Sequence, residues 1–110
     1  MKEMNYELIG TRLKKLRKYL SLTQEQVASI LGLGRDAIIN IEKGNRKIDV
    51  NELLKFSKLY NTPMEDLIEE DPKVNYDSAA YARGFNNLSK KDKKEIMELI
   101  EYKNSIKKQA

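Results

Sequence analysis

The chain has 110 residues, which is enough for one small hydrophobic core, or for one compact domain with an appendage. It contains no cysteine and no histidine, which excludes disulfides, thiolate nucleophiles, imidazole bases and the usual zinc ligands, and with them most enzyme mechanisms. Its 21 Lys and Arg residues outnumber its 17 Asp and Glu residues, and the net charge of +4 permits a polyanionic partner without requiring one.

The charge is distributed in blocks along the chain. Residues 1–60 carry a net charge of +5, residues 61–80 carry −5 and residues 81–110 carry +4. The N-terminus lacks the apolar run of a signal peptide, and no stretch approaches the roughly 18 to 20 apolar residues that a membrane span needs. We therefore expect a soluble, cytoplasmic protein without a membrane partner.

The first predicted helix follows from apolar residues at i, i+4, i+7 and i+11. The members of this stripe are Ile9, Leu13, Leu16 and Leu20. The remaining faces carry the basic residues Arg12, Lys14, Lys15, Arg17 and Lys18. The pattern predicts an amphipathic helix with a basic outer surface.

Two short helices follow, with a tight turn between them. Thr23 and Gln26 have the spacing of a capping box at the start of the second helix, and Gly32 is suited to end it. The third helix begins after Gly34 and stops at Gly44. Their inward positions are Val27, Ala28 and Leu31, and then Ala37, Ile38 and Ile41. Two helices joined in this way predict a helix-turn-helix.

Two further helices complete the first domain. Asp49 is placed to cap a fourth helix, whose apolar residues are Leu53, Leu54, Phe56 and Tyr60. In "TPMEDL", Thr62 is expected to cap a fifth helix, with Pro63 at its first position and Glu65 closing a capping box. Five helices and no strand pattern predict an all-α, compact domain over residues 6–70.

The C-terminal third predicts a linker followed by a helical tail. Residues 71–87 have weak periodicity and are interpreted as a linker, with a short helix across "SAAYAR". Ser89 and Asp92 then have the spacing of a helix start, and the tail helix is expected within residues 88–108. Its apolar stripe consists of Ile96, Leu99, Ile100 and Ile106.

Residues 6–68 resemble the helix-turn-helix domain of the XRE type, the family of phage repressors and Cro. The resemblance rests on "LTQEQVA", the glycine before the turn, "I-I-IEKG" and the "NELLKFSKLY…P-EDL" ending, in order and at the family's spacing. It implies a five-helix fold that binds double-stranded DNA without a cofactor or metal. It also implies a transcriptional regulator, most simply a repressor that binds a palindromic operator as a homodimer.

The resemblance also implies which side chains face the DNA. The base-reading positions are Arg35, Asp36, Ile39 and Asn40. Arg35 suits guanine or a phosphate, and Asn40 suits adenine or holds Gln24 in place. Asp36 either accepts from cytosine N4 or pairs with Arg35 or Arg46, because a carboxylate beside phosphates is otherwise repelled. Ile39 suits a thymine methyl group or a neighbouring side chain.

A second set of residues matches the family's phosphate contacts. These residues are Thr23, Gln24, Lys43, Asn45, Arg46 and Lys47. Arg17 and Glu42 match a buried ion pair between the first and third helices and are assigned to structure. The lysines of the first helix are interpreted as a solvated face, with direct DNA contact as the alternative.

The remaining apolar residues are candidates for an interface. Tyr60, Met64, Leu67 and Ile68 lie where XRE domains often pair, although they equally suit the core of the monomer. The tail stripe needs a partner, because an isolated helix of this length is marginal in water. That partner is its own domain, the tail of a second subunit, which we rank first, or another protein.

Two other functions stay open at this stage. The chain could be an antitoxin or interaction protein whose tail binds a toxin or a protease. An enzymatic function is by far the least favoured of the three, because its only support is the run of carboxylates Glu69, Glu70 and Asp71. This run is interpreted as a solvated joint at a helix end, so no catalytic residue and no metal ligand is expected.

Overall fold

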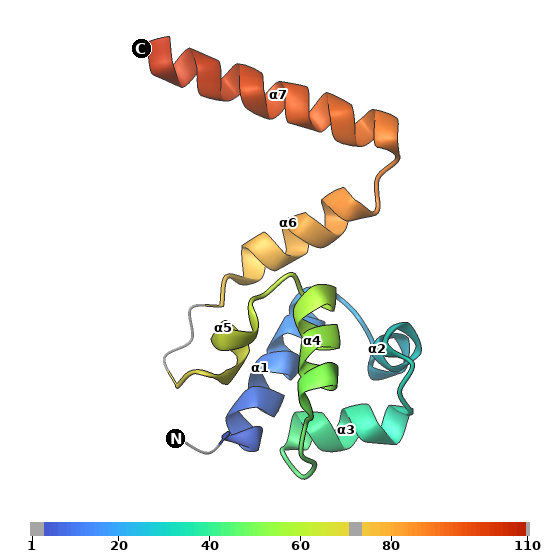
Figure 1. Cartoon of the computed structure of the whole chain (residues 1–110). Helices are drawn as coiled ribbons and strands as arrows, with labels where there is room; N and C mark the ends of the chain where they lie inside the picture. The colour runs from blue at the N-terminus through green and yellow to red at the C-terminus, as the bar shows by residue number, and fades with distance from the viewer. Residues whose placement is uncertain (1–3, 71–73, 110) are drawn as a thin grey trace.

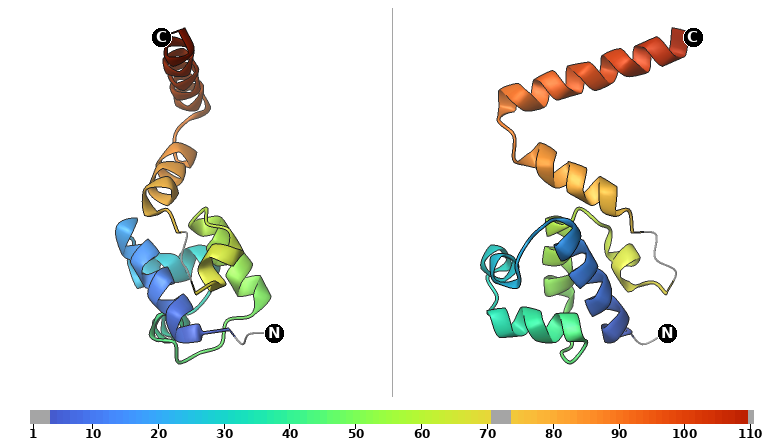
Figure 2. Two further views of the ribbon diagram at one scale, coloured as in Figure 1. Left: turned by 90° about the vertical axis from the view of Figure 1, so that its left-hand side faces the viewer. Right: turned by 180° about the vertical axis from the view of Figure 1, so that it is seen from behind.

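The computed structural model describes residues 4–70 and 74–109, and every regular element in these ranges is an α-helix (Figure 1). The helices are α1 (Tyr6–Tyr19), α2 (Gln24–Leu31), α3 (Arg35–Lys43), α4 (Val50–Leu59), α5 (Met64–Ile68), α6 (Tyr76–Asn86) and α7 (Lys90–Gln109). Helices α1 to α5 pack into a compact domain. Helix α6 leads away from this domain, and α7 stands clear of it in both views of Figure 2.

Local signals set the ends of α2 and α3 as predicted. The Thr23 hydroxyl accepts from the Gln26 N–H at 3.0 Å, and the Gln26 side chain accepts from the Thr23 N–H at 2.8 Å. Gly32 and Gly44 end the two helices with φ of 69° and 78°, a left-handed conformation that costs glycine little. Asp49 caps α4 through a second capping box, closed by Glu52.

The core lies where α1 crosses α3, with α2, α4 and α5 around it. The predicted stripes supply most of it. Its fully buried large side chains are Ile9, Leu13, Leu16, Val27, Ile38, Ile41, Leu53, Phe56, Tyr60 and Leu67. Leu54, one of the apolar residues of the predicted fourth helix, is 42% exposed, because it falls one position outside the stripe formed by Leu53 and Phe56.

Two residues expected at an interface belong to the core of the monomer. Tyr60 and Leu67 are fully buried, and the Tyr60 ring stacks on Phe56 with 6.1 Å between ring centroids. Burial raises the pKa of the Tyr60 hydroxyl. Met64 and Ile68 are half-buried against the same core. The sequence pattern could not separate these cases, because core and interface positions share one apolar spacing.

The start of α5 differs from its prediction. Its N-cap is Pro63, which makes no side-chain cap, and the helix begins at Met64. The Thr62 hydroxyl does not cap the helix but donates to the Tyr60 carbonyl at 3.0 Å. The buried position of Thr62 explains the difference, because a buried hydroxyl bonds to the nearest acceptor.

Arg12 also departs from its expected place on the outer face of α1. Its guanidinium is buried and donates to the carbonyls of Leu67 at 3.0 Å, Asp66 at 3.3 Å and Glu70 at 3.0 Å. These carbonyls lie at and beyond the end of α5, where a helix has acceptors without intrahelical partners and a negative dipole end. Arg12 therefore fastens α5 to α1.

The segment expected as a linker is mostly helix. Asp71 and residues 72–73 lie outside the described residues, and α6 covers residues 76–86, including the short helix expected across "SAAYAR". Ala79 is buried, the Tyr76 and Tyr19 ring centroids lie 5.8 Å apart, and the Tyr19 hydroxyl donates to the Asp77 carboxylate. These contacts dock the start of α6 on the end of α1.

Helix α7 begins as predicted, with the Asp92 N–H donating to the Ser89 hydroxyl at 3.1 Å. Its large apolar side chains are all exposed: Ile96, Met97, Leu99, Ile100, Tyr102 and Ile106. Ile96, Met97 and Ile100 line a groove shared with Tyr81 and Phe85 of α6. Leu99 and Ile106 do not line this groove.

Candidate nucleic-acid interface

A buried ion pair fixes α3 to α1. Arg17 Nε donates to Glu42 Oε2 at 2.7 Å and Nη2 donates to Oε1 at 3.0 Å, while Nη1 donates to the Leu22 carbonyl at 2.9 Å. Both side chains are less than a tenth exposed. The hydrogen bonds that Arg17 donates to Glu42 raise the pKa of Arg17. The structural role expected for these two residues agrees with this geometry.

Glu42 also holds the start of α2. Its Oε1 accepts from Gln24 Nε2 at 3.1 Å, so one carboxylate joins α1, α2 and α3. The sequence offered Asn40 as the residue that holds Gln24, and the structure gives that role to Glu42. Asn40 instead donates from Nδ2 to the Asp36 carbonyl of its own helix at 3.0 Å.

The face of α3 opposite this anchor is open to solvent. Arg35, Asp36, Asn40 and Lys43 are exposed and Ile39 is half-buried, while Ile38 and Ile41 point into the core. The four expected base-reading residues therefore lie on one outward side of a helix that is held rigidly from behind. A helix is about 10–12 Å across, which fits the major groove of B-DNA.

Asp36 lies in the first turn of α3, where the positive end of the helix dipole stabilises its negative charge. Gly34 provides no side-chain cap, so Asp36 is the acidic group at this end. The sequence offered Arg35 or Arg46 as its ion-pair partner. Within the part of the chain that the structure describes, Asp36 forms no ion pair with either arginine, and Arg46 pairs with Glu52 instead.

The loop after α3 carries two exposed polar or basic side chains and an arginine that forms an ion pair. Asn45 and Lys47 are exposed, as a phosphate contact requires. Arg46 instead donates to both carboxylate oxygens of Glu52, at 3.0 and 2.9 Å. The hydrogen bond from Arg46 lowers the pKa of Glu52. In this structure Arg46 ties the loop to α4, and its contact with a phosphate stays a prediction.

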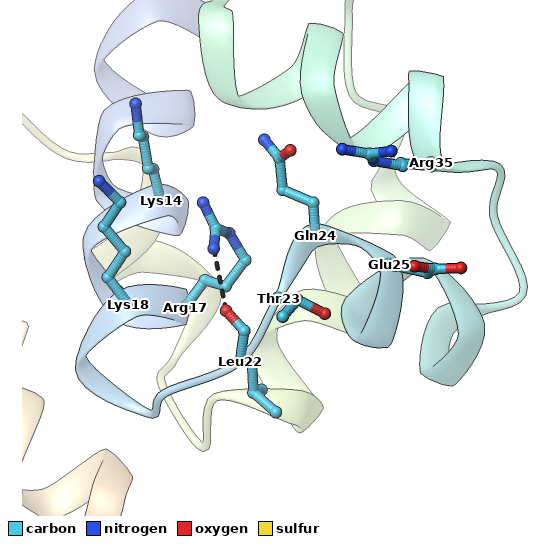
Figure 3. A pocket seen from close by; sticks show the side chains of 8 residues that line it. All are labelled: Lys14, Arg17, Lys18, Leu22, Thr23, Gln24, Glu25 and Arg35. Carbon is cyan, nitrogen blue, oxygen red and sulfur yellow. Dashed lines mark hydrogen bonds between the residues drawn. The ribbon is translucent and has the colours of Figure 1, made fainter.

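A cleft of about 550 Å³ opens between α1 and the starts of α2 and α3 (Figure 3). The residues that line it are Lys14, Arg17, Lys18, Leu22, Thr23, Gln24, Glu25 and Arg35. In Figure 3, Lys14 and Lys18 stand on one side and Arg35 on the other, with Gln24 between them. This cleft could not be predicted from the sequence, because it combines residues from three helices.

Among residues 4–70 and 74–109, no group of three or more His, Cys, Asp or Glu side chains is arranged to hold a metal ion. None of the helices described is long and apolar enough to cross a membrane.

Comparisons with known proteins agree on the family. A family model described as a helix-turn-helix domain matches residues 10–70. The chain is 36% identical over 63 residues to the HTH-type transcriptional regulator ImmR of Bacillus subtilis (strain 168), covering 57% of this chain and 50% of ImmR. It thus spans about half the length of that relative.

Two other matches extend the comparison. The cryptic phage CTXphi transcriptional repressor RstR of Vibrio cholerae is 26% identical over 96 residues, which is 86% of each chain. The crystal structure of the restriction-modification controller protein C.AhdI from Aeromonas hydrophila superposes with a TM-score of 0.54 and 28% identity, covering 57% of this chain and 96% of that one. With its capped α2, glycine turn and outward-facing α3, the chain belongs to the XRE-type family of helix-turn-helix DNA-binding domains.

Proposed function

We propose that the protein is a sequence-specific transcriptional repressor that binds a palindromic operator as a homodimer. The observation that carries this proposal is the outward face of α3, with Arg35, Asp36 and Asn40 exposed while Glu42 anchors the opposite side to α1. A rigid support matters, because base-edge hydrogen bonds discriminate only when the side chains arrive in a fixed register. The resemblance to proteins named as a regulator and a repressor supports the same conclusion.

In this proposal α3 enters the major groove and both of its ends meet the phosphate backbone. Thr23 and Gln24 approach one strand from the start of α2, and Lys43, Asn45 and Lys47 approach from the end of α3 and the loop after it. Phosphate contacts fix the register of the protein on the duplex, and base contacts select the sequence. Arg46 would join them only by leaving Glu52.

Homodimerisation supplies the length of sequence that one domain lacks. A single module reads about five base pairs, which is too few to single out one genomic site. Helix α7 offers a surface for pairing, because Leu99 and Ile106 lie seven residues apart and are exposed outside the groove with α6. Apolar residues at this spacing on an exposed helix face suit a second helix.

The test is a footprint on operator DNA chosen by selection from a random pool. We expect a protected inverted repeat with half-sites about one helical turn apart. Replacing Leu99 and Ile106 with glutamate should convert the dimer to a monomer in sedimentation and reduce the protected repeat to weak half-site binding. Uniform weak protection of any duplex by the unaltered chain would contradict the proposal.

A second candidate is an interaction protein, such as an antitoxin, whose tail binds a toxin or a protease. The uncovered apolar side chains of α7 favour it, since they suit a different protein as well as a second copy. The same double replacement separates the two candidates. If it alters neither the mass in solution nor the footprint, α7 does not pair with itself, which favours a different protein as its partner.

The two charged residues at the start of α3 should respond in opposite ways to removal. Arg35→Ala is expected to weaken operator binding by about 1–3 kcal/mol, because a bidentate contact to guanine is lost. Asp36→Ala is expected to leave the affinity for random DNA unchanged or to raise it, because a carboxylate that repels phosphates is removed. The ratio of the affinities for operator and random DNA should therefore fall. Fluorescence anisotropy with both duplexes measures this. If Asp36→Ala abolishes all binding while the fold survives, this role for Asp36 is wrong.

A further inference from the structure

We propose that Lys14 and Lys18 of α1, with Gln24 and Arg35, form a seat for one backbone phosphate of duplex DNA. The seat is the cleft between α1 and the starts of α2 and α3 (Figure 3). This inference rests on the proposed function and extends the DNA-contacting surface to the lysines of α1, which the sequence indicates first as a solvated face, with direct DNA contact as the alternative.

The cations of the seat are available to a ligand. Lys14 and Lys18 are four residues apart, so both side chains lie on one face of α1, and both are exposed. Neither of them, nor Arg35, makes an ion pair or hydrogen bond with any residue in the described ranges. Arg17, which lies between the two lysines in the chain, differs because Glu42 neutralises it.

The start of α2 adds donors at the centre of the seat. Its capping box occupies the Gln26 N–H, and the Val27 N–H donates to the Thr23 carbonyl. This leaves the N–H groups of Gln24 and Glu25 directed out of the first turn, where a helix binds anions best. Gln24 is held in place by Glu42, so these donors are fixed before any ligand arrives.

The charge balance of the cleft favours an anion. Glu25 lines it as well, and its carboxylate opposes a phosphate. This one carboxylate shares the cleft with Lys14, Lys18 and Arg35, which have no partner among the residues that the structure describes. A phosphate that enters would therefore meet net attraction, and the attraction is stronger in a concave site than on an open surface.

The position of the seat explains why a duplex suits it better than a free anion. Arg35 belongs both to the seat and to the outward face of α3, so a phosphate held there lies next to the groove that α3 reads. Lys43 and Lys47 lie at the other end of α3. The two cationic groups thus flank the recognition helix, as the two strands flank a major groove.

The experiment measures the salt dependence of DNA binding by the whole chain. The variant replaces Lys14 and Lys18 with alanine, and the matched control replaces Lys15 and Lys58, which are equally exposed and lie outside the cleft. For one lost phosphate contact we expect the slope of log K against log salt to fall in magnitude by about 0.9, and affinity at 0.1 M salt to fall about fivefold or more. The fold-change in affinity should be the same for operator and random DNA, because phosphates carry no sequence information. Alanine suits a helix, so the thermal midpoint serves only to verify folding.

A third variant is expected to change the affinity for DNA in the opposite direction. Glu25→Gln is expected to raise affinity for both duplexes about twofold, because it removes the opposing carboxylate. If the cleft variant and the control lose affinity and slope equally, the lysines act only through net charge and the seat is wrong. If the unaltered chain binds no duplex at all, the proposed function fails and the seat fails with it.

Discussion

Replacing Glu42 with alanine is expected to lower the free energy of unfolding by about 3–5 kcal/mol, because it leaves the buried Arg17 guanidinium without its counter-charge. The loss is larger than the pair's own net contribution, since two charges were already desolvated when the pair formed. Small domains are stable by only about 5–15 kcal/mol, so a substantial fraction of the variant should be unfolded at moderate temperature. Denaturation by urea, followed by far-ultraviolet circular dichroism, measures the change.

Glu52→Gln is the matched control. It also removes the carboxylate of a bidentate ion pair, but it leaves an arginine, Arg46, whose side chain is 38% exposed, so it should cost no more than about 1 kcal/mol. The two variants together separate the effect of burial from the effect of losing a pair. A loss of similar size in both would show that water reaches the Arg17 guanidinium, which contradicts its burial. The Glu42 variant should also bind DNA weakly even where folded, because Gln24 loses its anchor.

The elements that the sequence predicted correctly depend on neighbours in the chain. Thr23, Asp49 and Ser89 cap their helices through residues three positions away, and Gly32 and Gly44 end helices by their own conformational freedom. Such signals need no knowledge of the fold. Thr62 failed as a cap although its spacing was right, because burial offered its hydroxyl another acceptor.

The parts that could not be predicted depend on contacts between distant segments. Arg12 lies in the same basic stretch as the exposed lysines of α1, so its local sequence does not distinguish it from them. Only the packing of α5 against α1 reveals its role. Arg46 was assigned to a phosphate by its position in the loop. Its ion pair with Glu52, in the first turn of α4, was not apparent from the sequence. The outward face of α3 was accessible from periodicity, whereas the cleft beside it required three helices at once.

Gly10→Ala is expected to destabilise the domain by about 3 kcal/mol or more, because α1 touches the backbone of α3 at this residue. A Cβ atom on Gly10 would lie 2.3 Å from the Ile41 carbonyl oxygen and 2.8 Å from that of Glu42. Both are backbone atoms, so no side chain can turn aside and one of the helices must move. The gain of up to about 1 kcal/mol that alanine brings to a helix offsets only a part of this.

Gly84→Ala provides the contrast. Gly84 also lies within a helix, but its added Cβ would meet no atom within 4 Å, so the same substitution should raise stability by about 0.5–1 kcal/mol or leave it unchanged. Thermal unfolding of the two variants should therefore shift in opposite directions. Since Gly10 contacts the carbonyl of Glu42, a shift of α3 there also disturbs the carboxylate that joins α1, α2 and α3. Operator affinity should then fall together with stability, and normal binding by Gly10→Ala would mean that α3 can move relative to α1 without losing its place on DNA.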